Sequence, residues 1–437
     1  MTRPRWLWWV SPAGALLLVV PTSLLLAAGT SDLDFRLLYR TPKVVTGTQS
    51  LLFLAAGGAL LLGVLVPVAL RARRPAAAWP AGAAVDVDLL RRSSVVVFRL
   101  TLLGYAALGL AGVARGVRPA QLIGALTAQS NYGDVFRTAF APVTGITTLT
   151  QLGIAYVVLG ALLLSAGPAH EHGTVRRRLA VVLLLGLLRA FYLTERLALL
   201  ELVVPLVAVT AVRARRRGGS RRALDLTPAV ALPLLAVVFG AFEYSRSWVF
   251  FRTRTTSSFP HFVLDRLAGY YATAYNNGAI ALDHAAFPGR LPYSSIEGFW
   301  TAPGVQSLHL YQHLTGVDPL AAYAGLLQQY GTPEFNNPGG LSVPLVDFGV
   351  PVGLLVLLLL GLLVGALWVT FQDSSPHGLL LYPVAFTGVL ELPRYLYFTQ
   401  GRVVPPVLAL LVVAHLLRRR ARTSVPDPDP VRVLVPA

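Results

Sequence analysis

Long apolar runs separated by short polar segments dominate the chain. Several runs approach about twenty residues, enough at about 1.5 Å per residue to cross a hydrocarbon layer of about 30 Å. The pattern therefore predicts an all-α polytopic membrane protein with about ten transmembrane helices. The expected spans lie at about 8–28, 49–70, 95–114, 145–166, 179–194, 197–212, 228–248, 345–370, 377–393 and 403–417.

One apolar run is ambiguous, because Arg189 and Arg196 lie near the middle of the segment from Arg176 to Arg217. A single helix over residues 179–212 would be about 50 Å long, about 20 Å more than the hydrocarbon thickness. Burying an arginine at mid-membrane costs roughly 2.5–3.5 kcal/mol on insertion scales. We therefore predict two short antiparallel helices, with "RAFYLTER" as the turn between them.

A second segment, from His377 to Arg420, has the same form: two short spans around a polar turn. The two turns resemble each other in sequence, because Arg189-x-x-Tyr192-x-Thr194-x-Arg196 is matched by Arg394-x-x-Tyr397-x-Thr399-x-x-Arg402. Two interpretations stay open. The likeness is either chance between short strings or the mark of two arginine pairs that face one site.

Composition supports the membrane assignment and orients the helices. Of the 437 residues 55% are hydrophobic and 13% are charged, and the formal net charge is +17. The basic residues flank the apolar runs, as the positive-inside rule predicts, so we expect membrane topology signals and no nucleic-acid partner. With the N-terminus inside, the basic clusters fall on the cytoplasmic side, both termini are cytoplasmic, and the protein is a multi-pass protein of the cytoplasmic (inner) membrane. These clusters are Arg3 and Arg5, Arg71 to Arg74, Arg91 and Arg92, Arg176–Arg178, Arg213–Arg222 and Arg418–Arg422.

The spans divide the chain into four regions. Residues 1–249 hold about seven spans, 250–343 form one large extracytoplasmic loop with short helices, 344–420 hold about three spans, and 421–437 form a disordered cytoplasmic tail. The loop is too long for an idle connection. Its segment 262–281 has helical spacing, with Asp265 and Arg266 on the polar side.

Arginines on the external side point to an anionic ligand. The planar guanidinium fork suits bidentate contacts to phosphate oxygens, so the two turns predict a site for a membrane-held phosphate or diphosphate. The sequence has no nucleotide-binding motif, and because activated nucleotide sugars are cytosolic, an external enzyme would draw a polyprenyl-linked saccharide from the membrane. The chain has no cysteine, and Asp32-x-Asp34 is the only tight pair of external carboxylates. We expect no metal and no cofactor.

Six short motifs, in this order, carry a resemblance to a known family: "YRTPKVVTGTQSLLFL", "APVTGITTLTQLG", "YLTERLALLELVVP", "RLAGYYATAYNNGA", "EFNNPGGLSVPLVDFGVPVG" and "RYLYFTQGR". They resemble the oligosaccharide repeat-unit polymerases of the Wzy/O-antigen polymerase type, over most of the chain from Tyr39 to Arg402. The resemblance implies a GT-C-like polymerase/ligase architecture. It also implies transfer of a growing glycan from undecaprenyl diphosphate onto the next lipid-linked repeat unit, outside the membrane and without a metal.

The resemblance further implies which residues bind the substrate. The family's diphosphate-binding arginines map onto Arg196, Arg266, Arg394 and Arg402, with Arg189 assisting. The implied partners are undecaprenyl-diphosphate-linked oligosaccharides, as donor and acceptor, and the lipid bilayer, and a chain-length regulator is a further candidate.

The acceptor hydroxyl needs a general base within hydrogen-bond reach. The candidates are carboxylates and histidines of the external side: Glu195, Asp265, His261, His313, Glu334 and Asp347. Asp265 and Asp347 are preferred, although Asp265 has an alternative role in orienting Arg266, and Asp347 in capping its helix. External tyrosines, Tyr271 and Tyr397 among them, are candidates for stacking on sugar rings, although tyrosine is enriched at membrane interfaces anyway.

Other functions remain alternatives at this point. A ligase would move finished glycan to another acceptor, and a polyprenyl-phosphate-sugar-dependent GT-C glycosyltransferase would use Asp32 and Asp34 with a metal. A lipid-linked glycan transporter or flippase would need charged groups near the span centres, where Glu201 is the clearest example.

Overall fold

The computed structural model describes residues 7–73, 86–127, 136, 138–141, 145–193, 195–216, 219–248, 251–253, 257–284 and 291–423, and these residues form helices and loops without a strand. The α-helices are α1 Pro12–Gly29, α2 Asp32–Leu38, α3 Gly47–Arg73, α4 Val87–Ala114, α5 Pro119–Thr127, α7 Ile146–Ala166, α8 His172–Tyr192, α9 Leu197–Arg216, α10 Arg221–Asp225, α11 Thr227–Glu243, α13 Phe259–His284, α14 Glu297–Trp300, α15 Pro303–Ser307, α16 Leu310–Thr315, α17 Pro319–Tyr330, α18 Val343–Phe348, α19 Val350–Gln372, α20 Pro376–Glu391 and α21 Val404–Thr423. The short turns of tighter or wider helix are η1 Trp8–Val10, η2 Ala169–Glu171, η3 Tyr244–Trp248, η4 Ser294–Ile296, η5 Tyr397–Thr399 and η6 Gly401–Val403.

Seven helices in the described part of the chain are long and apolar enough to cross a membrane, which confirms an all-α membrane-protein fold. They are α1, α3, α4, α7, α9, α19 and α21. The remaining three of the expected spans coincide with helices that do not meet this description. Helices α11 and α20 have 17 and 16 residues, and α8 carries three arginines in its first half.

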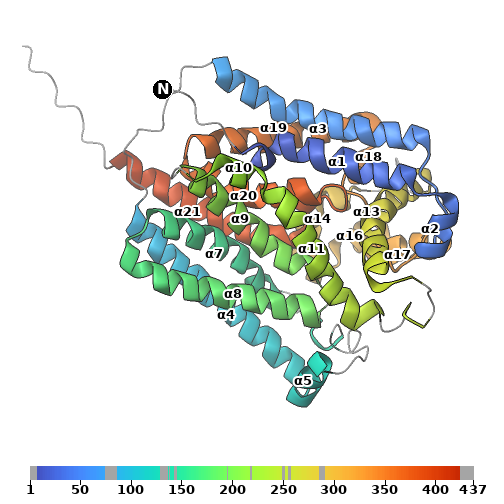
Figure 1. Ribbon diagram of the computed structural model, residues 1–437, viewed down its shortest axis with the longest axis horizontal. Coiled ribbons are helices and arrows are strands. Elements are labelled where there is room, and N and C mark those ends of the chain that lie inside the picture. The colour runs from blue at the N-terminus through green and yellow to red at the C-terminus, as the bar shows by residue number, and fades with distance from the viewer. Residues whose placement is uncertain are drawn as a thin grey trace, which may run out of the picture.

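Helix α7 is the central element of one half of the molecule. In its apolar window 72% of the residues are buried, against 28–44% for the other six long helices. It is surrounded by α4, α8, α9, α20 and α21 (Figure 1). A helix that is apolar on all sides can occupy such an interior position, because it presents no polar face that would need water.

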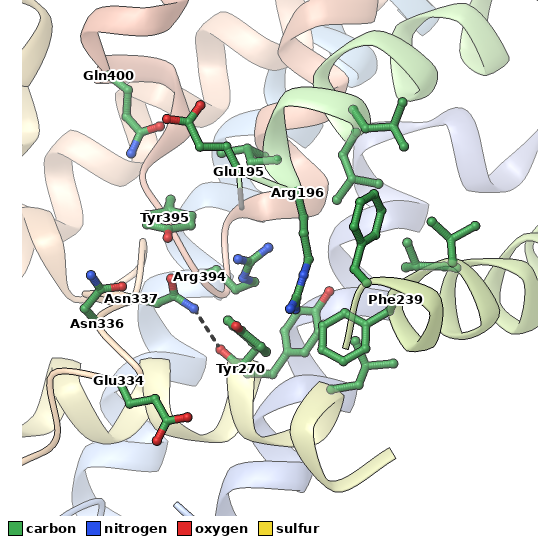
Figure 2. Close-up of a pocket in the computed structure, with 18 of the residues that line it drawn as sticks. Glu195, Arg196, Phe239, Tyr270, Glu334, Asn336, Asn337, Arg394, Tyr395 and Gln400 are labelled. Carbon is green, nitrogen blue, oxygen red and sulfur yellow. Dashed lines mark hydrogen bonds between the residues drawn. The ribbon is translucent and has the colours of Figure 1, made fainter. Parts of the chain in front are cut away.

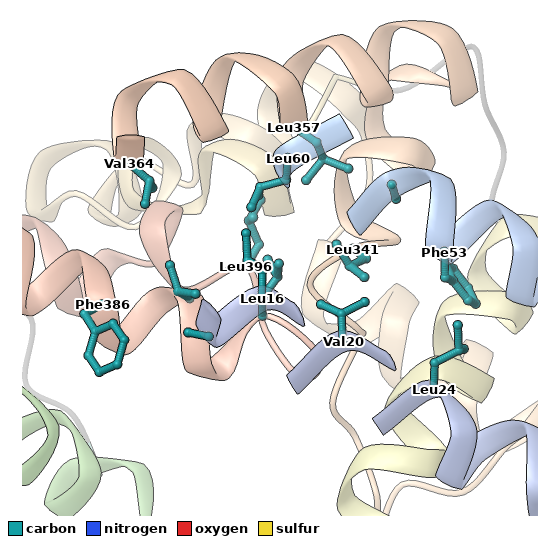
Figure 3. Close-up of a cluster of buried hydrophobic side chains, with 14 of the residues drawn as sticks. Leu16, Val20, Leu24, Phe53, Leu60, Leu341, Leu357, Val364, Phe386 and Leu396 are labelled. Carbon is teal, nitrogen blue, oxygen red and sulfur yellow. The ribbon is translucent and has the colours of Figure 1, made fainter. Parts of the chain in front are cut away.

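A second core joins the two ends of the chain. Side chains from α1, α3, α19 and α20 meet in a buried cluster, shown in Figure 3. Helices α3 and α19 approach backbone to backbone, because a Cβ at Gly63 would lie 2.1 Å from the carbonyl oxygen of Leu358, and one at Gly361 would lie 2.1 Å from that of Leu60. Small residues permit this close approach between apolar helices.

The expected span 345–370 is interrupted, which corrects that prediction. Gly349 has φ +77°, a left-handed conformation that ends α18 and separates it from α19. Pro351 lies in the first turn of α19, where its missing N–H costs no hydrogen bond. Asp347 therefore lies in the short helix α18, before the long helix begins.

Helix α13 confirms the predicted helix within 262–281, but its surroundings differ from those of a helix in an external loop. Every residue from Ala272 to Ala281 is buried. The helix packs on α1, where the hydroxyl groups of Tyr275 and Ser23 lie 3.0 Å apart. Arg266 is also buried, with 7% of its surface exposed, so it does not lie on a solvated polar face as expected.

The basic helix ends gather at one end of the bundle. There ion pairs link neighbouring elements: Arg71 with Asp373, Arg91 with Glu171 at 3.1 Å and Arg420 with Asp86 at 2.7 Å. In Figure 1 this end lies on the left, and α2, α13 and α17 lie on the right. The expected disordered tail lies outside the described residues, apart from its first three.

Candidate functional site

The two predicted hairpins are present. Helix α8 ends at Tyr192, α9 begins at Leu197, and the two pack against each other. A Cβ at Gly186 would lie 2.4 Å from the Leu202 side chain, so the two arms are in close contact. Helices α20 and α21 form the second hairpin, and α20 packs on α9. The four helices therefore bring their two turns to the same end of the bundle.

Both turns contribute to one cavity of about 390 Å³, which we call the arginine pocket (Figure 2). Arg196 comes from the first turn, and Arg394 and Arg402 come from the second. The pocket is completed by α9, α11, α13 and the loop at 333–337. Its lining residues are Glu195, Arg196, Leu197, Leu199, Leu200, Leu235, Val238, Phe239, Phe242, Leu267, Tyr270, Tyr271, Pro333, Glu334, Asn336, Asn337, Arg394, Tyr395, Gln400 and Arg402.

Glu243 at the end of α11 joins two of the predicted diphosphate-binding residues. It is fully buried and forms an ion pair with Arg196 through one carboxylate oxygen. Its other oxygen lies 3.6 Å from Nε of Arg266, and Nη1 of Arg266 donates to Glu334 at 2.6 Å. Arg196 also lies over the ring of Phe239, 4.3 Å from its centroid. Arg266 does not itself line the pocket, and it acts on the lining residues through Glu243 and Glu334.

The second turn is held in a similar way. Nη1 of Arg394 donates to Glu391 at 3.0 Å, and its guanidinium group lies 5.4 Å from the ring of Tyr270. Arg402 faces Glu201 of α9 at 3.5 Å. This contact links the two hairpins, because Glu201 belongs to the first and Arg402 to the second.

Arg189, like Arg266, lies behind the pocket and supports a residue that lines it. Its Nε and Nη2 both donate to Glu195, at 3.0 and 2.7 Å, and Nη1 donates to the hydroxyl of Thr150 at 2.8 Å. It does not line the pocket. Arg189 therefore orients Glu195, which does line it.

Arginines and glutamates form ion pairs in the wall of the pocket and behind it. The five arginines (Arg189, Arg196, Arg266, Arg394 and Arg402) are paired with five glutamates (Glu195, Glu201, Glu243, Glu334 and Glu391), so their formal charges cancel. Glu201, Glu243 and Glu391 are 7% exposed or less, whereas Glu195 and Glu334 are 30% and 34% exposed. The buried carboxylates fix the guanidinium groups before any ligand arrives, which is the preorganisation that an anion site needs.

The predicted catalytic residues do not all meet at this pocket. Glu195 lines it, and so does Glu334, which the sequence also named as a candidate base. Asp265 does not line it and lies 3.6 Å from His261 on the same helix. Burial raises the pKa of Asp265, and the charge of Asp34 raises it further.

Asp347 and His313 lie elsewhere. The carboxylate of Asp347 lines a second cavity and accepts the backbone N–H of Ser295 at 2.6 Å. Burial raises the pKa of Asp347, although this hydrogen bond opposes the shift. His313 is exposed on α16 and lines neither cavity. The structure therefore separates both of these residues from the arginines.

The two predicted sugar-stacking tyrosines also differ. Tyr271 lines the arginine pocket, but Tyr397 is only 1% exposed and does not. Tyr397 packs in the core around α7 and α21, so its ring is not accessible to a sugar, contrary to the prediction.

Several polar residues of the pocket were not singled out from the sequence. Asn336, Asn337 and Gln400 place amide groups in its wall, and the side chain of Asn337 donates to the carbonyl oxygen of Tyr270 at 3.2 Å (Figure 2). Glu243 and Glu391 were missed because each lies at the end of an apolar run. The "EFNN" string beside Gly and Pro was the available signal for Asn336 and Asn337, and "RYLYFTQGR" contains Gln400.

Among the described residues, no group of three or more His, Asp or Glu lies close enough together to hold a metal ion. Comparisons with protein-family models, curated proteins and solved structures find no match for this chain.

Proposed function

We propose that this protein is a glycosyltransferase that polymerises undecaprenyl-diphosphate-linked oligosaccharide repeat units at the outer face of the cytoplasmic membrane. One observation carries the proposal: Arg196, Arg394 and Arg402, from two hairpins far apart in the sequence, line the same cavity. The resemblance of the motifs to repeat-unit polymerases is in agreement with it.

The arginine pocket has the chemistry that a diphosphate leaving group needs. When the bond between the sugar and the diphosphate breaks, negative charge accumulates on the departing oxygens. Guanidinium groups that are already fixed stabilise this charge without reorganising. Each of the three lining arginines is paired with a carboxylate. A guanidinium group has five N–H donors, so one carboxylate partner does not use them all.

A lipid-linked substrate also needs an apolar path to its reacting end. The side of the pocket formed by α9 and α11 is apolar, with Leu197, Leu200 and Val238 among its residues. Helix α11 exposes Val230 and Val237 on its outer surface, with 69% and 68% of each residue accessible. A polyprenyl chain would therefore lie along the α9–α11 side, with its diphosphate among the arginines.

The base that accepts the proton of the acceptor hydroxyl is assigned to one of the two lining carboxylates, Glu195 or Glu334. Glu195 is oriented by two hydrogen bonds from Arg189, and Glu334 by one from Arg266. Each remains partly exposed to the cavity and so within reach of a sugar hydroxyl.

The orientation in the membrane follows the positive-inside rule. The basic clusters of α4, α8, α9 and α21 lie at the helix ends away from the two turns, so the pocket would face the outside.

Replacing Arg402 with lysine tests the proposal. Lysine keeps the charge but lacks the planar fork, so the purified variant should transfer lipid-linked repeats about 10²–10³ times more slowly, as when one preorganised donor is lost. The matched control is Arg418→Lys, at the exposed far end of α21, which should leave the rate unchanged. Product length is read on a gel. Polymer of normal length and rate from Arg402→Lys would contradict the proposal, and polymer that accumulates on its lipid carrier in cells lacking the protein would indicate a ligase.

A further inference from the structure

A second cavity, of about 530 Å³, lies between α13, α17, α18 and the segment 291–296. We call it the tyrosine cavity. Its volume falls within the range of about 300–1,000 Å³ that is typical of small-molecule sites. Its lining residues are Ala281, His284, Leu291, Tyr293, Ser294, Tyr311, Val317, Pro319, Ala322, Tyr323, Gly325, Leu326, Gln329, Tyr330, Val346 and Asp347.

Aromatic rings form much of its wall. Tyr293 and Tyr311 meet edge to face, with ring centroids 5.0 Å apart. His284 and Tyr330 also line the cavity, and their rings are stacked with centroids 3.7 Å apart and an interplanar angle of 5°. The contacts fix the orientation of these rings, and a rigid ring offers a flat apolar face at little cost in entropy.

Polar groups converge between the rings. Tyr323 lines the cavity, and its hydroxyl oxygen is buried. The carboxylate of Asp347 and the amide of Gln329 also line the cavity. The amide of Gln329, at an exposed position, can both donate hydrogen bonds to ligand hydroxyl groups and accept them.

The charge of the tyrosine cavity is the opposite of what a phosphate needs. Among the described residues that line it there is neither arginine nor lysine, and Asp347 is the one carboxylate. An acidic ligand would meet a buried carboxylate without a compensating cation, at a high cost in free energy. Flat apolar faces beside a few hydrogen-bonding groups instead fit the ring of a sugar, which has C–H groups on its faces and hydroxyl groups at its edge.

We infer that the tyrosine cavity is a carbohydrate-binding subsite that holds an uncharged sugar of the substrate glycan. This inference rests on the proposed function for the identity of the glycan, and on the cavity alone for the binding of a saccharide.

The turn between α20 and α21 contacts both cavities. The hydroxyl of Thr399 in this turn donates to the carbonyl oxygen of Ser294, at 3.0 Å, and Ser294 lines the tyrosine cavity. Gln400 and Arg402 of the same turn line the arginine pocket. A glycan whose diphosphate lies among the arginines would therefore reach the tyrosine cavity with sugars that are distant from the reacting bond.

Saccharide binding to the full-length protein in nanodiscs tests the inference. Saturation-transfer NMR would use free oligosaccharides of neutral hexoses and N-acetylhexosamines, together with the matching uronic acid oligosaccharides. Wild-type protein should bind at least one neutral oligosaccharide and none of the acidic ones. Tyr330→Ala should weaken this binding about tenfold, because it removes a stacking face, whereas Tyr330→Phe should retain it. Gln329→Ala, at an exposed position, should also weaken it and provides a second variant if Tyr330→Ala does not fold.

Two controls separate this inference from the proposed function. Arg402→Lys should bind neutral saccharide as the wild type does but should lose binding of inorganic diphosphate, measured by calorimetry. Tyr330→Ala should bind inorganic diphosphate as the wild type does but should bind neutral saccharide about tenfold more weakly. If the wild type binds no neutral saccharide, or if Tyr330→Ala and Gln329→Ala bind it unchanged, the inference is overturned. Failure of diphosphate to bind the wild type would count against the proposed function and leave the saccharide result standing.

Discussion

In the arginine pocket each lining guanidinium group is paired with a glutamate, whereas the tyrosine cavity is lined by stacked rings and one carboxylate. On the two proposals above, the first arrangement would select a charged group and fix its position. The second would select a ligand by its shape and exclude charge. The contact between Thr399 and Ser294 joins the two. A substrate with one strongly charged end and a long uncharged body would need both kinds of wall.

Because ion pairs of the arginine pocket are buried, the stability of this site depends on each of the paired residues. A buried charge is tolerated only while its partner is present, because an unpaired charge in an apolar interior has lost its hydration without compensation. Glu243 is the extreme case, since it faces both Arg196 and Arg266 and is fully buried. The tyrosine cavity has no counterpart to it, because rings that lose one neighbour keep most of their other contacts.

Glu243→Gln should therefore have the largest effect on stability. The change keeps the shape of the side chain but leaves Arg196 without its anion and Arg266 with Glu334 as its remaining carboxylate, and we expect a loss of roughly 3–5 kcal/mol in the free energy of unfolding. The measurement is denaturant unfolding of the purified protein in detergent.

The control for this prediction is Glu334→Gln, which removes a carboxylate from the same network at a side chain that is 34% exposed. Water and salt screen such a pair, so we expect a loss of about 1 kcal/mol or less. Equal losses in the two variants would contradict the view that burial, rather than the number of pairs, decides the stability of the pocket.

The next largest effect is expected on activity, from the replacement of Arg196 with lysine. Arg196 lines the pocket, and a point charge cannot replace its fork, so we expect repeat-unit transfer to slow by about 10²–10³. Arg189→Lys is the matched comparison, because Arg189 contacts Glu195 but not the cavity. It should retain much more activity in the same assay. If Arg189→Lys is as slow as Arg196→Lys, the distinction between lining and supporting arginines is wrong.

The sequence predicted the arginine pocket better than the tyrosine cavity, and the reason is energetic. An arginine within an apolar run is so costly at mid-membrane that few arrangements of the chain remain, and the hairpin is one of them. This argument correctly placed Arg196 in the turn after α8, and the second segment's likeness placed Arg402 in the turn before α21, whereas Arg189 lies within α8 and not in the turn as expected. It could not identify Glu243 as the support of Arg196, because the position of α11 beside α9 and α13 depends on contacts distant in sequence.

The tyrosine cavity was not predictable in this way. Tyr293, Tyr311 and Tyr330 come from separate short elements whose packing is not specified by any periodic pattern. Asp347 was preferred for the arginine site because it lies close in sequence to a long span, and the break at Gly349 redirects it to the other cavity. Short helices joined by loops give weak local signals, so the relative position of their side chains is set by tertiary packing.

The likeness between the two turns also had limited structural meaning. The hydroxyl of Tyr192 donates to the carbonyl oxygen of Leu122, whereas Tyr397 is buried in the core. Arg189 supports Glu195 behind the pocket, whereas Arg394 lines it. Only Arg196 and Arg402, the last arginines of the two turns, have comparable positions, because both line the arginine pocket. The strings therefore match in residue type but not in role.

The smallest expected effect concerns Asp347, the one carboxylate of the tyrosine cavity. Burial raises the pKa of this carboxyl above its ordinary value of 3.8, so its ionised form is less favourable in the folded protein than in the unfolded chain. In the wild type the protonated carboxyl makes its full contribution to the free energy of unfolding below pH 3.8. This contribution is lost as the pH rises through the raised pKa. Asp347→Asn keeps an oxygen that accepts the N–H of Ser295 and has no charge to lose.

The melting temperature of Asp347→Asn relative to the wild type should therefore increase with pH across that window and become constant above it. The measurement is thermal unfolding in detergent at a series of pH values. A difference that is constant or decreases with pH would show that the carboxylate is stabilised by its hydrogen bonds more than burial disfavours it. The tyrosine cavity would then tolerate negative charge, and its contrast with the arginine pocket would be weaker than the lining residues indicate.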